Sequence, residues 1–237
     1  MVQLTQNHPY VTLRVKFKKV GSLQYISHLD LVRTMHKVVT RAKLPLWYTE
    51  GFNPKPKLIF AAPLSIGTES VTEYVDIKLI DDIDPAEAIR RMNENMADEM
   101  QVLDAYYTES KPTELKWLSY RMTVVTDGAG DALADKCNKL FASDSIMIEK
   151  KAKPGDEPKL FDLKPLIRSI NVCFDSERAS LVIDAVLSSD SSAFLNPEYI
   201  IKALRKHVGI LSAPDITSEW WSIMRLAAYK EDMSPFA

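Results

Sequence analysis

Eight lysine and arginine side chains in the first sixty residues are the groups best suited to chemistry, because their spacing gathers them on regular elements. They are Arg14, Lys16, Lys18, Arg33, Lys37, Arg41, Lys55 and Lys57. The first three alternate with apolar residues and share one face of an expected strand, while the next three recur every fourth residue and share one face of an expected helix. Several cations on one surface bind backbone phosphates, so these residues predict contacts to RNA. The strand group and the helix group need not form one surface.

The distribution of charge along the chain points to the same region. Residues 11–60 hold ten Lys and Arg against two Asp and Glu, a local charge of +8, whereas residues 61–110 have a local charge of −9. The whole chain of 237 residues has a formal net charge of only −2 because these regions cancel. Such asymmetry affects partners and association rates. An alternative stays open, in which the cations are a solvated face that Asp76 on a neighbouring strand neutralises.

The segment 48–57 is the least generic stretch of the sequence. Gly51 permits a positive φ, and prolines on both sides of Lys55 stiffen the chain. This composition predicts a preorganised binding loop that presents Phe52, or else a Pro-braced connection into the next strand. In the following turn, Gly67 could form an anion nest, although the carboxylate two residues later argues against phosphate.

His28 and His36, together with Asp30, have the residue types of an acid–base or metal-binding group. A metal site needs converging ligands, and no second cluster of carboxylates or thiolates accompanies these residues. Ser27 and Asp30 instead fit a capping box, in which each side chain accepts from the backbone amide of the other. The sequence therefore predicts no metal site, no catalytic residue and no cofactor.

Several classes of protein are excluded by what the sequence lacks. The two cysteines, Cys137 and Cys173, form neither a CxxC pair nor an iron–sulfur ligand cluster, which indicates a reduced protein without a disulfide framework. The chain has no GxxxxGK(S/T), GxGxxG, HExxH or GxSxG motif. No apolar run is long enough to span a membrane, and residues 1–9 carry no signal-peptide core. We therefore expect a cytoplasmic protein without membrane contact.

The order of the expected elements defines the fold class of the first half. Alternation of apolar and polar residues predicts strands, and apolar residues at helical spacing predict helices. These patterns give a strand at 12–19, a helix at 27–42, strands at 58–62 and 71–79, a helix at 85–96 and a strand at 102–107. The order strand, helix, strand, strand, helix, strand is that of the ferredoxin-like α+β arrangement.

The second half is expected to form a similar unit after a boundary near Pro112. Its patterns predict strands at 118–126, 146–151, 170–174 and 179–187, helices at 130–141 and 196–207, and a last strand from Ile216. No sequence repeat relates the two halves. We therefore predict an α+β protein with two ferredoxin-like antiparallel-sheet units in tandem, an N-terminal domain over residues 1–112 and a C-terminal domain over residues 113–237.

Four motifs in the first half carry a family resemblance. They read Gly21-Ser-Leu-Gln-Tyr-Ile-Ser-His-Leu-Asp30, Arg41-Ala-Lys-Leu-Pro-Leu-Trp-Tyr48, Gly51-Phe-Asn-Pro-Lys-Pro56 and Ala62-Pro-Leu-Ser-Ile-Gly-Thr-Glu-Ser70. With these motifs the chain resembles the bacterial radical SAM-linked (radical SAM-associated) domain-of-unknown-function family, strongly over residues 10–110 and diffusely beyond. The motif residues expected on a common surface are Ser27, His28, Asp30, Gly51, Phe52, Asn53, Pro54, Pro56, Gly67, Glu69 and Ser70.

The resemblance implies partners rather than an activity. In that family the domain is commonly fused to, or encoded beside, a radical SAM enzyme, often near genes for RNA processing and ribosomal proteins. The first hypothesis is a non-catalytic accessory protein that presents ribosomal or transfer RNA to a radical SAM enzyme in trans for modification or processing, with His28 and Phe52 near the base or the partner. One alternative is a protein–protein adaptor without RNA contact. Another is a ferredoxin-like endoribonuclease that uses His28 as a general base.

Overall fold

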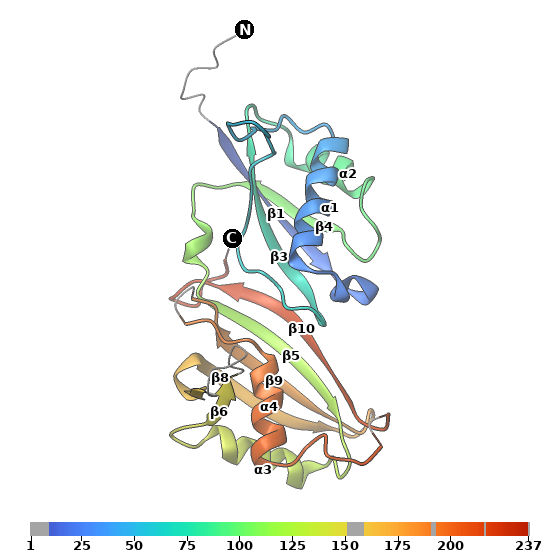
Figure 1. Ribbon diagram of the computed structural model, residues 1–237, viewed down its shortest axis with the longest axis vertical. Coiled ribbons are helices and arrows are strands. Elements are labelled where there is room, and N and C mark those ends of the chain that lie inside the picture. The colour runs from blue at the N-terminus through green and yellow to red at the C-terminus, as the bar shows by residue number, and fades with distance from the viewer. Residues whose placement is uncertain (1–9, 151–158, 191–192, 216, 237) are drawn as a thin grey trace. The chain divides into compact units, whose positions relative to one another are not determined.

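The computed structural model describes residues 10–150, 159–190, 193–215 and 217–236 and divides into two compact units (Figure 1). Unit 1 is Met1–Glu114 and unit 2 is Leu115–Ala237, so the division falls two residues beyond the expected boundary at 112. Each unit combines α-helices with an antiparallel sheet, which is the α+β class predicted. In the part of the chain that the structure describes, no helix is both long and apolar enough to cross a membrane.

Unit 1 contains six regular elements in the predicted order. They are β1 (Val11–Lys19), α1 (His28–Arg41), β2 (Leu58–Phe60), β3 (Thr68–Leu79), α2 (Pro85–Asn93) and β4 (Val102–Tyr107). Two short 3-10 helices, η1 (Gly21–Tyr25) and η2 (Pro112–Glu114), were not predicted. The strands lie in the order β4-β1-β3-β2, and every neighbouring pair is antiparallel.

Alternation along β1 determines which face of the sheet is buried by the helices. Leu13, Val15 and Phe17 are completely buried and belong to one apolar core with Met35 of α1 and Met92 of α2. Because successive side chains of a strand point to opposite faces, the charged residues between them lie on the face that these helices do not cover. The helices therefore occupy one side of the sheet of unit 1, and Arg14 and Lys16 of β1 lie on the other.

The ends of α1 and α2 follow from their capping residues, with two corrections. At the start of α1, the Ser27 hydroxyl accepts from the Asp30 amide at 3.1 Å, as predicted. The Asp30 carboxylate does not return to the Ser27 amide but accepts from the Ser27 hydroxyl at 2.7 Å, so the reciprocal capping box is wrong. At α2, Asp84 accepts from the amide of Ala86 at 3.3 Å, and the helix ends at Asn93 rather than Met96.

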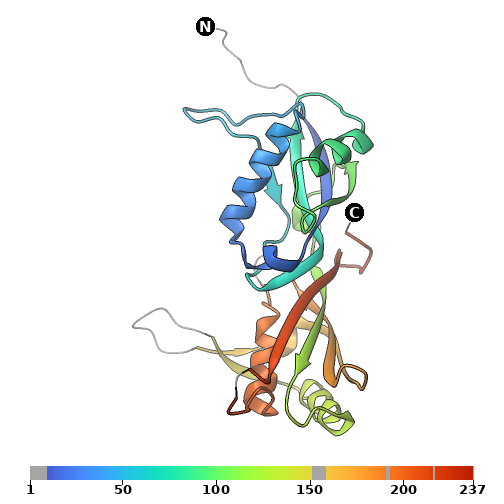
Figure 2. The same cartoon turned by 90° about the vertical axis from the view of Figure 1, so that its right-hand side faces the viewer.

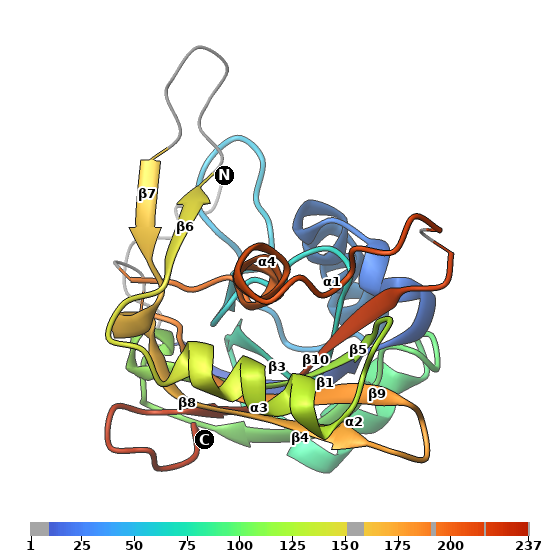
Figure 3. The same ribbon diagram turned by 90° about the horizontal axis from the view of Figure 1, so that it is seen from below.

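Unit 2 is built from a similar series with one added hairpin. Its elements are β5 (Trp117–Val125), α3 (Asp131–Phe141), β6 (Met147–Lys150), β7 (Lys159–Asp162), η3 (Lys164–Leu166), β8 (Ile167–Asp175), β9 (Ser180–Ser188), α4 (Glu198–His207) and β10 (Trp220–Tyr229). Strands β6 and β7 pair with each other, outside the main sheet (Figure 3). The predicted end of the strand 146–151 and the predicted start of the last strand at residue 216 lie outside the described residues.

The two sheets share one connectivity although their sequences show no repeat. The strand order β10-β5-β9-β8 of unit 2 corresponds element by element to β4-β1-β3-β2 of unit 1. Both units also insert a segment between their first helix and the next strand of the sheet. In unit 1 this insertion covers residues 42–57, and in unit 2 it contains the β6–β7 hairpin.

Candidate nucleic-acid interface

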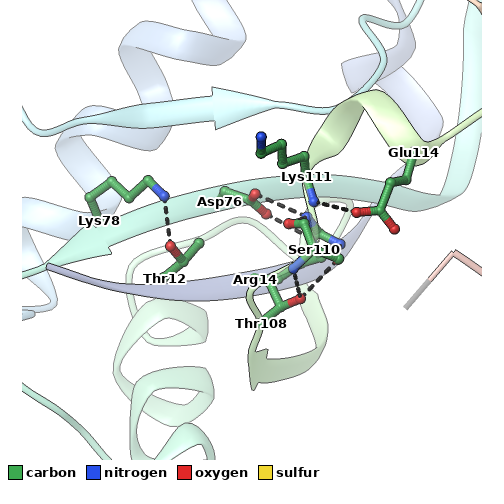
Figure 4. Close-up of polar contacts among 8 residues, drawn as sticks. All are labelled: Thr12, Arg14, Asp76, Lys78, Thr108, Ser110, Lys111 and Glu114. Carbon is green, nitrogen blue, oxygen red and sulfur yellow. Dashed lines mark hydrogen bonds and ion pairs between the residues drawn. The ribbon is translucent and has the colours of Figure 1, made fainter.

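Arg14, the first of the predicted phosphate contacts, is buried and fully engaged by protein groups. Its guanidinium binds the Asp76 carboxylate through two hydrogen bonds, Nε to Oδ1 at 2.7 Å and Nη2 to Oδ2 at 3.0 Å. It also donates to Ser110, with Nη1 2.7 Å from Oγ and Nη2 2.9 Å from the carbonyl oxygen (Figure 4). The Arg14 side chain is 0% exposed, so the prediction that it contacts phosphate is wrong.

The surroundings of Arg14 explain why it is not a binding residue. Asp76 is the cross-strand neighbour of Arg14 on β3, and Tyr106 is its neighbour on β4. Burial raises the pKa of Tyr106 to about 12. The charge of Arg14 is therefore neutralised by Asp76, the residue that the alternative interpretation of the sequence named. Lys16, on the same face, and Lys18 are half-buried.

The three predicted cations of α1 lie on its exposed side. Arg33, Lys37 and Arg41 are all exposed, while the buried residues of this helix face the core. Arg33 forms an ion pair with Asp30 at 3.2 Å, which partly neutralises it. Just beyond the helix, Lys43 is also exposed, and its positive φ of 52° turns the chain towards the following segment. Lys43 was not predicted as a phosphate contact, because a single lysine after a helix has no periodic signal.

Residues 46–57 form a hairpin-like projection that we call the arm. Its two sides are joined by hydrogen bonds from the Thr49 amide to the Lys55 carbonyl at 2.9 Å and from the Lys57 amide to the Trp47 carbonyl at 3.1 Å. Its base is fixed to β3, since Trp47 donates to the carbonyl of Lys78 at 2.9 Å and Lys78 donates to that of Lys57 at 3.1 Å. In Figure 2 the arm is the light-blue segment that extends past α1.

Lys55 of the arm acts electrostatically on a residue of α1. Burial lowers the pKa of His36, and the positive charge of Lys55 lowers it further. His36 lies on α1 between Arg33 and Lys37, so Lys55 is near the cationic side of that helix. We define the cationic surface as the exposed residues Arg33, Lys37, Arg41, Lys43, Lys55 and Lys57. This arrangement can bind a polyanion.

The histidine at the start of α1 is not arranged as a general base. The ring of His28 packs edge-on against Phe60, with centroids 5.3 Å apart. Its Nδ1 is buried without a hydrogen-bond partner, while the Asp30 carboxylate contacts Ser27 and Arg33 instead. Among the described residues no group of three or more His, Cys, Asp or Glu side chains could hold a metal ion.

The motif residues divide into an exposed set and a structural set. At the tip of the arm Gly51, Phe52, Asn53 and Pro54 are exposed, and Pro56 is half-buried where it bridges to Tyr48. Gly67 in the turn before β3 and Glu69 in β3 instead contact the 3-10 helix η1, so the anion nest suggested for Gly67 is not needed to explain this turn. The Gly67 amide donates to the carbonyl of Gln24 at 2.9 Å.

Two carboxylates hold the start of η1 from opposite directions. Glu69 accepts from the Gly21 amide at 2.7 Å, and Glu99, which the sequence did not single out, accepts from the Ser22 amide and hydroxyl, each at 2.8 Å. A Cβ on Gly21 would lie 2.1 Å from Oε1 of Glu99, so a larger residue there would displace this carboxylate. Ser70 is buried, and its hydroxyl accepts from the Thr72 amide at 3.1 Å.

Comparisons with known proteins give a family and two distant structural likenesses. A family model described as "Uncharacterized protein conserved in bacteria (DUF2344)" matches residues 12–197. No curated protein matches the chain. A solved structure titled "Crystal Structure of a Cbf5-Nop10-Gar1 Complex" is similar at 12% identity and a TM-score of 0.49, over 93% of this chain and 50% of that chain.

The second structural likeness is to an "Unknown Protein from Galdieria sulphuraria", at 8% identity and a TM-score of 0.27. It covers 92% of this chain and 99% of that chain. Both TM-scores are below 0.5, so neither likeness bears on the function of the cationic surface.

Proposed function

Because this chain belongs to the bacterial family of uncharacterized proteins whose model spans residues 12–197, we propose that it is a non-catalytic accessory protein that binds RNA through the cationic surface. The RNA is ribosomal or transfer RNA, presented to a partner radical SAM enzyme for modification or processing. We also propose that both units are ferredoxin-like domains, which their common strand order supports.

The observation that carries this proposal is a set of exposed cations without counter-charges. Among the described residues, no ion pair within 4 Å involves Lys37, Arg41, Lys43, Lys55 or Lys57. On α2, by contrast, Arg90 and Arg91 both contact Glu87 at 2.7 Å. A surface whose cations are left unpaired attracts phosphates, and each phosphate that it neutralises releases bound counterions from the RNA.

The proposed division of labour with a partner follows from the cysteines. A radical SAM enzyme needs a cluster of cysteine ligands, whereas this chain has only Cys137, which is buried, and Cys173, which is exposed. The iron–sulfur chemistry would therefore reside in the partner, and this chain would supply RNA contacts. The partner itself rests on the family resemblance.

The salt dependence of RNA binding tests the proposal. We would titrate a labelled structured RNA with the full chain, follow fluorescence anisotropy and repeat the titration at several salt concentrations. The test variant replaces Lys37, Arg41, Lys55 and Lys57 by alanine. The matched control removes the same charge from exposed positions of unit 2 and replaces Lys139, Arg178, Lys202 and Arg205 by alanine.

We expect log affinity to fall linearly with log salt, with a slope that shrinks by about 0.7 to 0.9 for each lost phosphate contact. The magnitude of this slope should therefore be smaller by roughly 3 in the test variant, and the control should retain the wild-type slope. Failure of the wild-type chain to bind RNA at low salt would contradict the proposal, and so would equal effects of the two variants.

The adaptor hypothesis is the second candidate, because the cationic surface could equally meet an acidic protein. The acidic stretch 61–110 offers a contrasting surface of charge −9 in sequence, although α2 neutralises part of it internally. Salt-sensitive binding to a protein partner without RNA selectivity would favour the adaptor. Support for the endoribonuclease hypothesis would require RNA cleavage that is lost in the His28→Ala variant. The contacts of His28 do not support a role as general base.

A further inference from the structure

Phe52 is the most exposed large apolar side chain in the described part of the molecule, and neither the core nor the cationic surface accounts for it. It is fully exposed at the tip of the arm, where nothing packs against it. Gly51 beside it has a φ of +119°, a conformation that glycine adopts readily and other residues rarely do. The backbone is therefore shaped to project Phe52 into solvent.

The base of the arm is rigid enough to hold that side chain in place. The Lys55 amide donates to the Thr49 hydroxyl at 3.1 Å, and this bond adds to the backbone bonds that close the two sides. At the other end, the rings of Tyr10 and Trp47 lie 5.7 Å apart, and Lys78 Nζ lies 4.5 Å from the Tyr10 centroid. A projecting aromatic on a braced support loses little conformational entropy when it binds.

The residues around Phe52 indicate which ligand chemistry it meets. Lys55 and Lys57 follow it on the same arm, so an apolar ring is combined with two exposed cations. This combination is typical of sites that bind unpaired nucleotides, where a ring stacks on a base and cations contact the backbone. An anionic lipid surface fits less well, because the tip also carries the acidic Glu50, whose charge such a surface repels, and the polar Asn53.

We infer that Phe52 stacks on an unpaired base, so that the RNA bound by the cationic surface is a single-stranded or loop segment rather than a continuous duplex. This inference rests on the proposed RNA binding and adds the class of RNA to it. Bases within a duplex are stacked on one another and offer no free face to a projecting side chain. Phe52 would select an unpaired segment, and the cations would supply the overall affinity.

The experiment compares an RNA hairpin that carries 2-aminopurine in its loop with a fully paired duplex of the same length. Stacking on an aromatic ring changes the fluorescence of 2-aminopurine. The variants are Phe52→Ala, which removes the ring, and Phe52→Leu, which keeps apolar bulk without an aromatic face. Leu160→Ala, at an exposed apolar position of unit 2, is the matched control, and circular dichroism confirms that each variant folds.

We expect Phe52→Ala to weaken binding of the loop RNA by about 5- to 150-fold, which corresponds to the loss of one base–aromatic stack. The salt dependence should keep the wild-type slope, because an apolar contact releases no counterions. Duplex binding should not change, Phe52→Leu should recover little, and Leu160→Ala should match wild type. The 2-aminopurine signal should change on binding to wild type and not on binding to Phe52→Ala.

Four outcomes would overturn the inference, and the first three leave the proposed RNA binding standing. If the four-alanine variant weakens RNA binding while Phe52→Ala does not, RNA binding stands and base stacking fails. If wild type binds duplex and loop equally, the selection of unpaired RNA fails. Binding to phosphatidylglycerol vesicles that depends on Phe52, with RNA binding unaffected, would assign the ring to a membrane. If wild type binds no RNA, the proposed function and this inference both fail.

Discussion

The two units carry the same arginine–aspartate pair at equivalent places in their sheets, yet only one pair is buried. Arg14 on β1 binds Asp76 on β3, and Arg121 on β5 binds Asp184 on β9, in each case through Nε and Nη2 at 2.7 to 3.0 Å. The side chains are 0% and 3% exposed in unit 1 but 54% and 47% exposed in unit 2. The same side-chain pair thus has two different environments.

The difference shows why cations on a strand are poor indicators of a binding surface. In unit 1, Ser110 accepts twice from Arg14, so the segment after β4 completes a closed polar cluster (Figure 4). In unit 2 the Arg121 guanidinium stays largely open to solvent. The residues of the cationic surface lie instead on α1, just beyond it at Lys43, and on the arm.

Removing the carboxylate from each pair gives the largest expected contrast. Asp76→Ala leaves the buried Arg14 charge without its partner and should lower the free energy of unfolding by about 3 to 5 kcal/mol. Asp184→Ala should lower it by about 0 to 1 kcal/mol, because solvent screens an exposed pair. Urea unfolding followed by circular dichroism measures both changes, and equal losses would show that the environments do not differ in the way described.

A paired replacement serves as the control for the buried site. Arg14→Met combined with Asp76→Leu removes both charges and should recover most of the stability that Asp76→Ala loses, since apolar residues of similar volume often replace a buried ion pair without loss. If the double variant is as unstable as Asp76→Ala, the pair acts through more than its charge.

One glycine in each unit gives a second comparison, with a smaller expected change in stability. Gly21 and Gly128 have positive φ values of 61° and 70°, so alanine at either position should cost about 1 to 2 kcal/mol from the backbone alone. Gly21→Ala should cost more than Gly128→Ala, because its Cβ also collides with Glu99, whereas Gly128 has open space. Thermal unfolding of the two variants compares them, and a smaller effect at Gly21 would contradict the role given to Glu99.

The titration of His36 gives the smallest expected effect. Because burial and Lys55 lower the pKa of His36 in the folded state, the unfolded chain takes up its proton at a higher pH. Stability should therefore fall as the pH drops below about 6.5. RNA phosphate beside Lys55 would counter its charge and raise the pKa of His36. NMR titration of the ring with and without RNA tests this, and a pKa unmoved by saturating RNA would place the phosphate elsewhere.

Local patterns in the sequence predicted most of the elements of unit 1. Alternation along β1 and the Ser27 cap of α1 are properties of neighbouring residues, so both elements could be predicted. Strand β7 of unit 2 was missed, although β6, which is equally short, was predicted. The common strand order of the two units was expected from the order of their elements, although the two halves show no sequence repeat.

The candidate site was less predictable because its contacts join distant parts of the chain. Arg14 is separated from Asp76 by 62 positions and from Ser110 by 96, so its burial had no local signal. The effect of Lys55 on His36 links residues 19 positions apart, which no local pattern predicts. The prolines of the arm predicted a stiff segment, but not that Phe52 would project from its tip.

Crosslinking most directly tests whether RNA meets unit 1 on its helix side. We would bind the full chain to a hairpin RNA with 4-thiouridine in its loop, irradiate the complex and identify the crosslinked peptides by mass spectrometry. Peptides from residues 33–57 should carry the crosslinks, with Phe52 among the modified positions. Crosslinks confined to residues 168–186 of unit 2, or to β1 around Lys16, would contradict the assignment of RNA binding to the cationic surface.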